Sequence, residues 1–461
     1  MRQTITKQAR PAPSFRAPLD PAARWRRLFA QGAVSLALGV VLPAALYLVC
    51  ARLGVNLAPA IYAVTLLSLL IVAVTTWVQA LLSLRRLTPP ATTGELPPAT
   101  ALIVAYLPNE AATIRATVEA FLRLAYPGPF QVLLAYDTPR DLPVEAELRA
   151  LAERDARFLP LRVAHSTSKS ACANAALAHI TGAITGLFDA DHHPRSGGFE
   201  RAWRWLDAGV DAVQGCPVVR NGAASALAAY LAVEWEANGA VCHDGRARLH
   251  GFGFFGGSDG YWRTATLRRL RFDPAMLCED TELSLRALEQ GARIVVDPAL
   301  VSSELAPVRA AGLWHQRLRW IQGNLDALLL HAGPMLHSRR VSIRQKLGFL
   351  QLLFVNTAYP WLVLQIAALA LARLIGGSTL GVGWAALAGM CAVLLLGTGP
   401  AMTLGAWRFA RPEVRGHARW FAAYLLLASV VDTPLKAFMT ALAQVRGVLR
   451  AREWVPTVRS T

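Results

Sequence analysis

Hydrophobic positions form long continuous runs near both ends of the chain and short blocks, broken by polar residues, in its middle. The long runs cover residues 33–50, 59–84, 347–372, 381–407 and 420–442. A run of about 20 apolar residues is long enough to cross the hydrocarbon layer of a bilayer. The pattern therefore predicts a more polar middle domain carried between two groups of membrane helices.

The distribution of basic residues predicts the orientation of these helices. Arginine and lysine collect before the first run, after the second, between the last two and in the C-terminal tail. Cytosolic flanks of membrane helices are enriched in these residues, so we expect the middle domain and both termini on the cytosolic side of the inner (plasma) membrane. Three crossings after residue 347 would place the C-terminus outside. The charges favour a broken hairpin around Asp432, Thr433 and Pro434 or a run that does not cross, and leave five or six crossings open.

The middle of the chain alternates between two kinds of periodicity. Apolar, strand-like blocks lie at 101–106, 131–137, 158–164 and 183–191. Helical patterns lie between them, at 110–124 with Asn109 as its cap and at 168–180. Strand–helix alternation predicts an α/β fold with a mainly parallel sheet, helices on both faces, and ligands at the carboxyl ends of the strands.

Acidic residues occur where these strands end. Asp137 closes one strand, and Asp189 and Asp191 close another within the stretch FDADHHP. Strand residues two apart share a face, and paired carboxylates suit a hard divalent cation such as Mg²⁺ or Mn²⁺. An acidic turn that caps the next element is the plainer alternative. For His193 we expect an exposed turn position, whereas His192 stays open as a further metal ligand.

Composition narrows the class of protein. The chain has 461 residues, 54% of them hydrophobic, and a formal net charge of +17. The mean hydropathy is +0.35. No nucleic-acid-reading motif accompanies the positive charge, so we expect contact with an anionic lipid surface rather than nucleic acid. Six cysteines without a CxxC pair fit a reducing compartment.

Two further polar stretches follow the predicted strands. Glu279 and Asp280 begin a helical pattern that ends at Gly291, which suits either a general base or simple compensation of the helix dipole. In HQRLRW (315–320), Arg319 is placed to meet phosphate, with lipid contact as the alternative. GFGFFG (251–256) matches a dinucleotide fingerprint in letters, but it does not open a helix after the first strand of a βαβ unit.

Taken in order, these motifs resemble those of processive family 2 glycosyltransferases, close to bacterial cellulose and curdlan synthases and similar to hyaluronan and chitin synthases. The matching stretches are LPNE (107–110), Asp137, KSACANAAL with Lys169, the D-x-D of Asp189 and Asp191, FFGGS (254–258), Asp280 as the aspartate of a TED element, and Q-x-x-R-W at Gln316, Arg319 and Trp320. Cys278 replaces the threonine of the TED element, and Asp137 lacks an adjacent second acid.

The resemblance implies a role for each of these positions. Asp280 would be the catalytic base and Asp191 the ligand of Mg²⁺ or Mn²⁺. Donor binding would fall to Asn109, Glu110, Asp137, Lys169, Asp189 and Arg319. Acceptor binding would fall to Gly257, Ser258, Glu279, Gln316 and Trp320. WVPTVR (454–459) resembles a gating loop in which Thr457 and Arg459 touch the diphosphate, although a short basic tail is the alternative.

The implied organisation is a GT-A domain inserted between transmembrane segments. Its ranges are 1–32, a basic cytosolic tail; 33–86, two transmembrane helices; 98–310, the GT-A domain; 311–346, interfacial helices with Q-x-x-R-W; 347–445, a C-terminal transmembrane region; and 446–461, a cytosolic tail.

The implied activity is inverting, processive polymerisation of a β-linked polysaccharide from a UDP-sugar, most readily a β-glucan, with export through the protein's own channel. Its partners would be the UDP-sugar donor, the growing polysaccharide, the lipid bilayer and, as an open alternative, export subunits. A non-processive transferase that acts on a lipid carrier is the alternative, and a transporter or sensor with a metal-binding domain is the rival of another class. The sugar, the linkage and the oligomeric state stay open.

Overall fold

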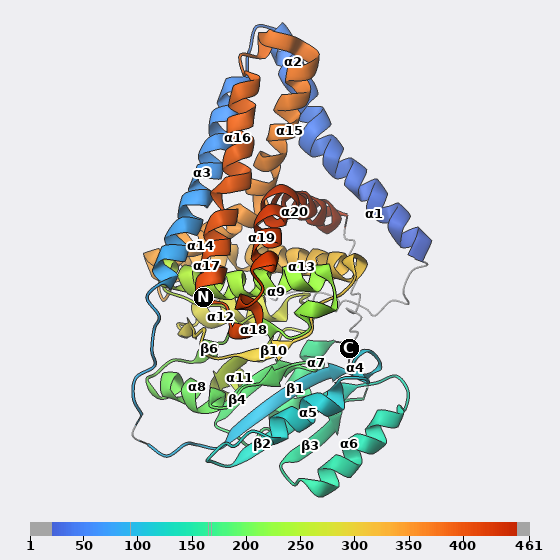
Figure 1. Ribbon diagram of the computed structural model, residues 1–461, viewed down its shortest axis with the longest axis vertical. Coiled ribbons are helices and arrows are strands. Elements are labelled where there is room, and N and C mark those ends of the chain that lie inside the picture. Colours follow the sequence, from blue (N-terminus) through green and yellow to red (C-terminus); the bar gives the residue numbers. More distant parts are fainter. Residues whose placement is uncertain (1–20, 93, 165, 167, 450–461) are drawn as a thin grey trace, which may run out of the picture.

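The computed structural model describes residues 21–449, apart from 93, 165 and 167 (Figure 1). An α/β domain forms the lower part of the molecule and a bundle of long helices rises above it. The predicted gating-loop residues Thr457 and Arg459 lie outside the described residues.

A seven-stranded sheet forms the centre of the α/β domain. Its order is β3 (Phe158–Arg162), β2 (Phe130–Asp137), β1 (Ala99–Tyr106), β4 (Ile184–Asp189), β8 (Gly260–Arg263), β6 (Ala212–Gln214) and β9 (Ile294–Val296). β8 is antiparallel to its neighbours β4 and β6, and the other pairings are parallel. A three-stranded sheet joins β5 (His193–Pro194), β10 (Ser302–Glu304) and β7 (Val218–Val219). The predicted strand–helix alternation and α/β class are confirmed.

Helices cover both faces of the large sheet. One face packs on α5 (Ile114–Leu122), α6 (Pro143–Arg154) and α8 (Gly198–Asp207) around buried residues such as Phe121 and Phe188. The other face packs on α7 (Lys169–Ala176), α11 (Thr264–Leu270) and α12 (Glu279–Glu289) around Trp262 and Leu283. Two apolar faces account for the nearly continuous burial of β1 and β2.

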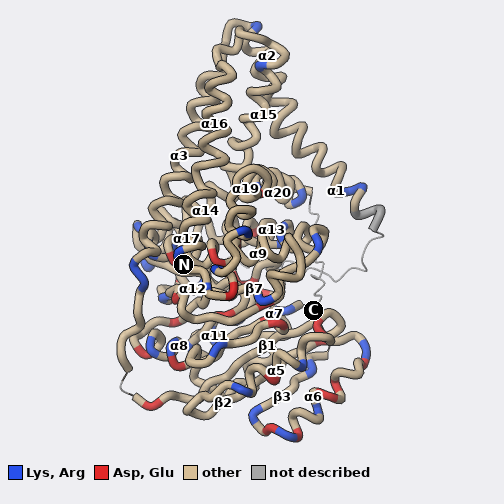
Figure 2. Tube along the Cα trace, in the orientation of Figure 1, with Lys and Arg blue, Asp and Glu red and all other residues tan. Residues whose placement is uncertain are grey.

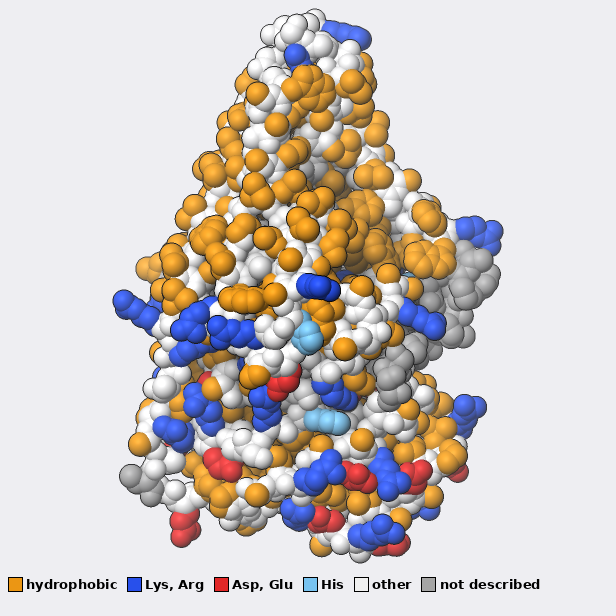
Figure 3. Space-filling model, in the orientation of Figure 1, with side chains coloured by type: hydrophobic (Ala, Val, Ile, Leu, Met, Phe, Trp, Pro, Cys, Tyr) orange, Lys and Arg blue, Asp and Glu red, His pale blue; other side chains and the backbone are white. Residues whose placement is uncertain are grey.

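The upper part of the molecule is apolar on its outside, as the hydrophobic side chains in Figure 3 show. Among residues 21–449 that the structure describes, five helical segments are long and apolar enough to cross a membrane: Trp25–Arg52, Ala58–Leu82, Tyr359–Leu380, Trp384–Phe409 and Ala418–Val448. They comprise α1 (Pro21–Leu36) with α2 (Leu42–Arg52), α3 (Ala58–Ser83), α15 (Tyr359–Gly376), α16 (Trp384–Gly397) with α17 (Gly399–Phe409), and α19 (Ala418–Leu427) with α20 (Thr433–Val448). Exposed leucine and valine side chains on these helices suit contact with lipid.

A layer of helices joins the two parts of the molecule. It contains α9 (Ala226–Ala237), the π-helix η4 (Asn238–Gly245), α10 (Arg246–His250), α13 (Ala310–His337) and α14 (Ile343–Thr357). Most of the arginine, lysine and acidic residues lie in this layer or below it (Figure 2). Such a distribution places the boundary between bilayer and water near this layer.

The last apolar segment is not straight. α19 and α20 run in different directions in Figure 1 and are joined by the π-helical residues Ala428–Asp432. Lys436 at the start of α20 bonds with Glu234 of α9 at 2.7 Å and with Asp432 at 2.6 Å. The irregularity includes Asp432, around which the charges allowed a broken hairpin as one of two alternatives, but the segment stays helical from Ala418 to Val448. The start of α20 is tied to the layer below the bundle.

Three local predictions need correction. The helix expected over 110–124 begins at Ile114, because residues 107–110 form a separate turn, α4, in which Asn109 donates to Glu110 instead of capping. Within 311–346, expected as interfacial helices, the basic stretch 337–346 is not itself one helix: it contains the end of α13 and the start of α14, which Ser342 caps. The run 347–372 is broken at Ala358, just before Pro360, a residue that starts helices more readily than it continues them.

Candidate active site

A cleft of about 180 Å³ opens at the carboxyl ends of β1, β2 and β4. In β1, Val104 pairs with Asp189 of β4 and Tyr106 pairs with Asp137 of β2, so both aspartates reach the same edge of the sheet. The cleft wall contains eleven of the residues singled out in the sequence: Asn109, Glu110, Asp137, Lys169, Asp189, Gly257, Glu279, Asp280, Gln316, Arg319 and Trp320. Segments separated by about 200 residues in the sequence therefore meet in one place.

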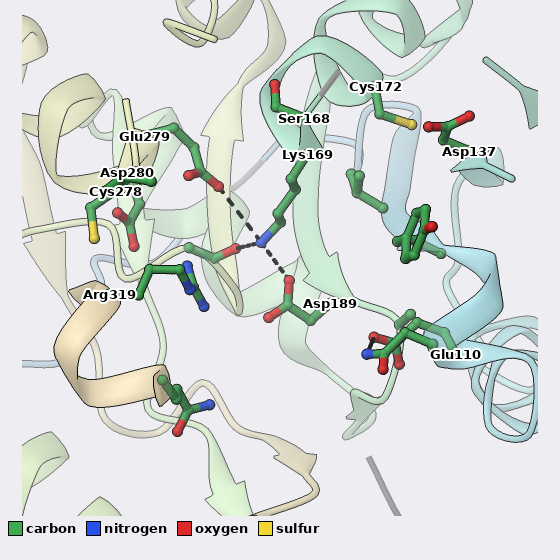
Figure 4. Close-up of a pocket in the computed structure, with 18 of the residues that line it drawn as sticks. Glu110, Asp137, Ser168, Lys169, Cys172, Asp189, Cys278, Glu279, Asp280 and Arg319 are labelled. Carbon is green, nitrogen blue, oxygen red and sulfur yellow. Dashed lines mark hydrogen bonds and ion pairs between the residues drawn. The ribbon is translucent and has the colours of Figure 1, made fainter. Parts of the chain in front are cut away.

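Lys169 occupies the middle of the cleft (Figure 4). Its ammonium group lies 2.5 Å from Asp189, 3.0 Å from the Gly257 carbonyl and 4.0 Å from Glu279. Ser168 caps α7 by accepting a hydrogen bond from the Ala171 N–H, which fixes the lysine in the first helical turn. The arrangement holds a positive charge where a donor diphosphate would need one.

Asp280 lies in the first turn of α12, beside Glu279. Burial and, to a smaller extent, the Glu279 carboxylate raise the pKa of Asp280 from 3.8 to about 6. The Thr281 N–H donates to one of its oxygens at 2.7 Å. A carboxylate with a pKa close to neutral is suited to accept a proton during a reaction.

Gly257 permits a close approach to this carboxylate. Its φ is +86°, in the region that favours glycine, and a Cβ here would lie 2.8 Å from Oδ2 of Asp280. The neighbouring Ser258 is buried, and its hydroxyl accepts a hydrogen bond from the Asp189 N–H at 3.0 Å. Ser258 therefore braces β4 and lines a second cavity instead of the first cleft.

The α13 side of the cleft has polar atoms left for a ligand. Within the part of the chain that the structure describes, Nε of Arg319 and Oε1 of Gln316 are buried without hydrogen-bond partners. Cys278 joins α12 to this helix, with its Sγ 3.5 Å from the Trp320 carbonyl. Gly323 faces the cysteine so closely that a Cβ would lie 2.5 Å from Sγ. The cysteine therefore packs α12 against α13, in the position where the resembling family has threonine.

Glu110 and Asp137 lie on the side of the cleft opposite Arg319 (Figure 4), and Asn109 lines the same cleft. Asn109 donates to Glu110 at 2.9 Å, so the two side chains are oriented as a pair. Their placement near the ends of β1 and β2 is the one predicted for donor-binding residues, and their role stays a prediction.

Asp191 does not line the cleft. β4 ends at Asp189 and the chain turns, so Asp191 does not continue the strand face on which the sequence placed both carboxylates. The Asp191 side chain is fully buried and accepts a hydrogen bond from the Leu305 N–H at 3.0 Å. Within the described residues, no group of three or more His, Cys, Asp or Glu side chains is placed to hold a metal ion. The geometry thus offers one carboxylate of the D-x-D at the cleft and no preformed metal site, and Asp191 as a metal ligand stays a prediction.

A second cavity, of about 360 Å³, adjoins the first. Six residues line both: Asp189, Gly256, Cys278, Asp280, Glu304 and Trp320. Glu304 was missed by sequence reasoning because nothing in VSSEL marks it, yet it accepts a hydrogen bond from the Trp235 indole and faces His192 at 3.4 Å. The Trp235 and Trp320 rings lie 6.2 Å apart at this junction. The candidate base therefore stands between two connected spaces, as a reaction between two substrates requires.

Comparison with known proteins agrees with this geometry. Residues 97–323 match the family described as "Glycosyltransferase like family 2". A probable glycosyltransferase, YdaM of Bacillus subtilis, is 27% identical over 266 residues, which cover 54% of this chain and 60% of that protein. The solved mannosyltransferase PcManGT of Pyrobaculum calidifontis, in complex with GDP-Man and Mn²⁺, is 20% identical, with a TM-score of 0.56 over 86% of this chain and 99% of its own.

These matches agree with the α/β topology of the domain. They do not bear on the specific likeness to cellulose and curdlan synthases. Residues 97–323 form a family 2 glycosyltransferase domain with the GT-A fold, set between apolar helices of membrane-spanning length.

Proposed function

We propose that the protein is an inverting sugar transferase that uses a nucleoside diphosphate sugar, with a UDP-sugar as the expected donor. The single observation that carries this proposal is the convergence of Lys169, Asp280 and Arg319 on one cleft of a family 2 glycosyltransferase domain. Basic side chains face the place of a diphosphate, and a carboxylate with a raised pKa stands at the junction with a second cavity.

The side chains support a single displacement. An acceptor hydroxyl in the second cavity attacks the anomeric carbon of the donor sugar, and Asp280 accepts the hydroxyl proton. The bond to the diphosphate breaks with its electron pair, and Lys169 and Arg319 stabilise the negative charge of the leaving group. One displacement inverts the anomeric centre. General-base assistance typically contributes about 10²- to 10⁴-fold to the rate.

A divalent cation, Mg²⁺ or Mn²⁺, stays part of the proposal without a step assigned to it. Carboxylates of the D-x-D suit hard cations, and the similar PcManGT structure holds Mn²⁺. Bound near the diphosphate, the cation would neutralise phosphate charge.

For the product, we propose polymerisation of a β-linked polysaccharide, a β-glucan in the first instance, on the cytosolic side of the inner membrane. This rests on the resemblance to processive synthases and on the second cavity, which reaches Leu352 and Asn356 of α14 below the bundle. Transfer to a lipid carrier is the second candidate, and the apolar wall of the same cavity favours it. A processive polymerase would also have to export the polymer through the bundle of membrane helices.

The deciding experiment uses the full chain in lipid nanodiscs with a panel of UDP-sugars and GDP-mannose. Release of UDP with one donor supports the proposed donor class, and release of GDP alone would move the donor to GDP-mannose. Sizing of the labelled product then separates a long ladder, expected for a polymerase, from a single added sugar, expected for a lipid-carrier transferase. No nucleotide release with any donor would refute the proposed function.

A further inference from the structure

The residues that line the second cavity differ between the part shared with the donor cleft and the rest of the wall. Its junction with the cleft contains three acids, Asp189, Asp280 and Glu304. Residues that line the second cavity alone include a different set: His243, Arg246, Phe254, Leu328, Leu352 and Asn356. The lining shared with the donor cleft therefore contains three acids, whereas the rest of the lining contains one arginine together with apolar and neutral polar side chains.

Arg246 has no carboxylate partner within 4.0 Å in the part of the chain described here, and its Nε is buried without a hydrogen bond. Its guanidinium lies 4.9 Å from the centre of the Phe254 ring. Other arginines of the same layer are paired: Arg317 with Glu234 at 2.5 Å, and Arg248 with Asp244 at 2.8 Å. Burial lowers the pKa of Arg246. Arg246 as a whole is half-buried. A cation that is largely removed from water without a counter-charge is unfavourable, which is expected where a ligand supplies the missing anion.

The neighbouring His243 does not neutralise the charge of Arg246. Its Nδ1 is also buried without a partner, and burial together with Arg246 lowers the pKa of His243 to about 3. The ring is therefore neutral at physiological pH and offers a hydrogen bond beside the guanidinium. A phosphate, which has several acceptor oxygens, can use both groups at once.

This part of the cavity faces the membrane helices. Arg246 follows the π-helix η4, and Gly245 packs so tightly on α3 that a Cβ would lie 2.1 Å from the Gln79 carbonyl. On the same π-helix, Val241 packs against Gly405 of α17. Arg246 therefore lies next to the membrane helices, and Leu352 of α14 lines the same cavity.

We infer that the second cavity binds a lipid-linked saccharide through the phosphate next to its sugar, with Arg246 as the phosphate ligand. This inference rests on the proposed transferase function, favours its second candidate, transfer on a lipid carrier, over a neutral glucan, and names the acceptor class of that candidate. The acceptor sugar lies against Trp320 and Trp235 with its hydroxyl at Asp280, and the phosphate meets Arg246 and His243. The lipid continues toward α14. A neutral glucan would leave the arginine uncompensated, whereas a phosphate neutralises it.

The test compares three acceptors: one carries its negative charge on a diphosphate, one is uncharged, and one carries its charge on a sugar carboxylate. They are farnesyl-diphosphate-linked glucose, the uncharged dodecyl glucoside and dodecyl glucuronide, each titrated against the full chain in nanodiscs made from zwitterionic lipid. Binding is measured by calorimetry without donor, and transfer by nucleotide release. The variants are Arg246→Gln and Arg246→Lys, with Arg339→Gln as the matched control. Arg339 is exposed between α13 and α14, so the control removes one charge outside the cavity.

We expect the diphosphate-linked acceptor to bind at least tenfold more tightly than dodecyl glucoside. Arg246→Gln should remove about ten- to a hundredfold of that affinity, in line with a lost charge-assisted hydrogen bond. Arg246→Lys should restore part of it, and Arg339→Gln should behave as wild type. A diphosphate-linked acceptor that binds no better than the neutral glucoside would overturn the inference. If dodecyl glucuronide bound as tightly as the diphosphate-linked acceptor, the site would be specific for acidic saccharides, and the assignment of a phosphate ligand to Arg246 would be refuted. Because binding is read without donor, a chain that binds the acceptor yet releases no nucleotide would refute the proposed function and leave the acceptor site standing.

Discussion

Replacing Asp280 with asparagine should lower activity and raise stability at the same time. The side chain keeps its shape but loses the ability to accept a proton, so we expect kcat to fall about 10²- to 10⁴-fold. Donor binding should change little, because Lys169 and Arg319 remain in place. Nucleotide release gives kcat, and titration with UDP gives the affinity for the donor's leaving group.

The stability effect follows from the pKa. Burial raises the pKa of Asp280 from 3.8 to about 6, so the ionised side chain is less favourable in the folded protein than in the unfolded chain. Each pKa unit corresponds to about 1.4 kcal/mol, which sets an upper bound of about 3 kcal/mol, lowered by the partial solvent exposure of the side chain. This penalty is present above pH 6 and disappears below pH 4. Asp280→Asn should therefore raise the Tm at pH 8 and leave it nearly unchanged at pH 4.

Glu282, on the same helix, is the matched control with the opposite sign. Arg286 at 2.8 Å and His331 at 3.3 Å hold the pKa of the buried Glu282 down, at about 2. Its ionised form stabilises the fold above pH 4.5, and this contribution is lost as the pH falls toward 2. Glu282→Gln should therefore lower the Tm at pH 8. An Asp280→Asn protein with near-normal kcat would remove Asp280 from the role of base, and a lowered Tm at pH 8 would refute the argument from burial.

Three further outcomes are expected. The rate should rise with pH through about 6 as Asp280 loses its proton, to about a tenth of its plateau at pH 5; a pH-independent rate between 5 and 8 would contradict this. Gly257→Ala should lower kcat at least tenfold, because the positive φ and the contact with Asp280 oppose a Cβ. Gly256→Ala is the control: its Cβ would lie 3.9 Å from the nearest atom, so its effect on kcat should be mild. Equal effects of the two substitutions would count against the proposed fit of Gly257 against Asp280. EDTA should abolish transfer and Mn²⁺ or Mg²⁺ should restore it, with Asp191→Asn lowering the apparent metal affinity; activity retained in EDTA would remove the cation from the proposal.

Several features of the fold were predictable because they depend on local pattern. The strands at 101–106 and 131–137 are buried on both faces and read as continuous apolar runs, and their edges agree with the structure within two residues. Their parallel pairing followed from the helices between them. Because carboxyl ends of parallel strands meet at one edge, the meeting of Asp137 and Asp189 at one cleft also followed. The conflict between charge and the number of crossings left two alternatives near Asp432 open, and the structure has a π-helical irregularity at Ala428–Asp432 within a continuous helical segment.

Other features depended on contacts between segments far apart in the sequence. Asp191 is two residues from Asp189, but the turn after β4 and the Leu305 N–H bury it, and strand periodicity does not apply beyond the last paired residue. Glu304 and Arg246 carry no local motif, since their positions follow from β10 and from the packing of η4 on α3. Sequence pattern thus determined the elements, the membrane frame and the motif-bearing strand ends. Tertiary structure decided which side chains share a cavity and which charges lack a partner, because burial and pairing are properties of segments brought together by folding.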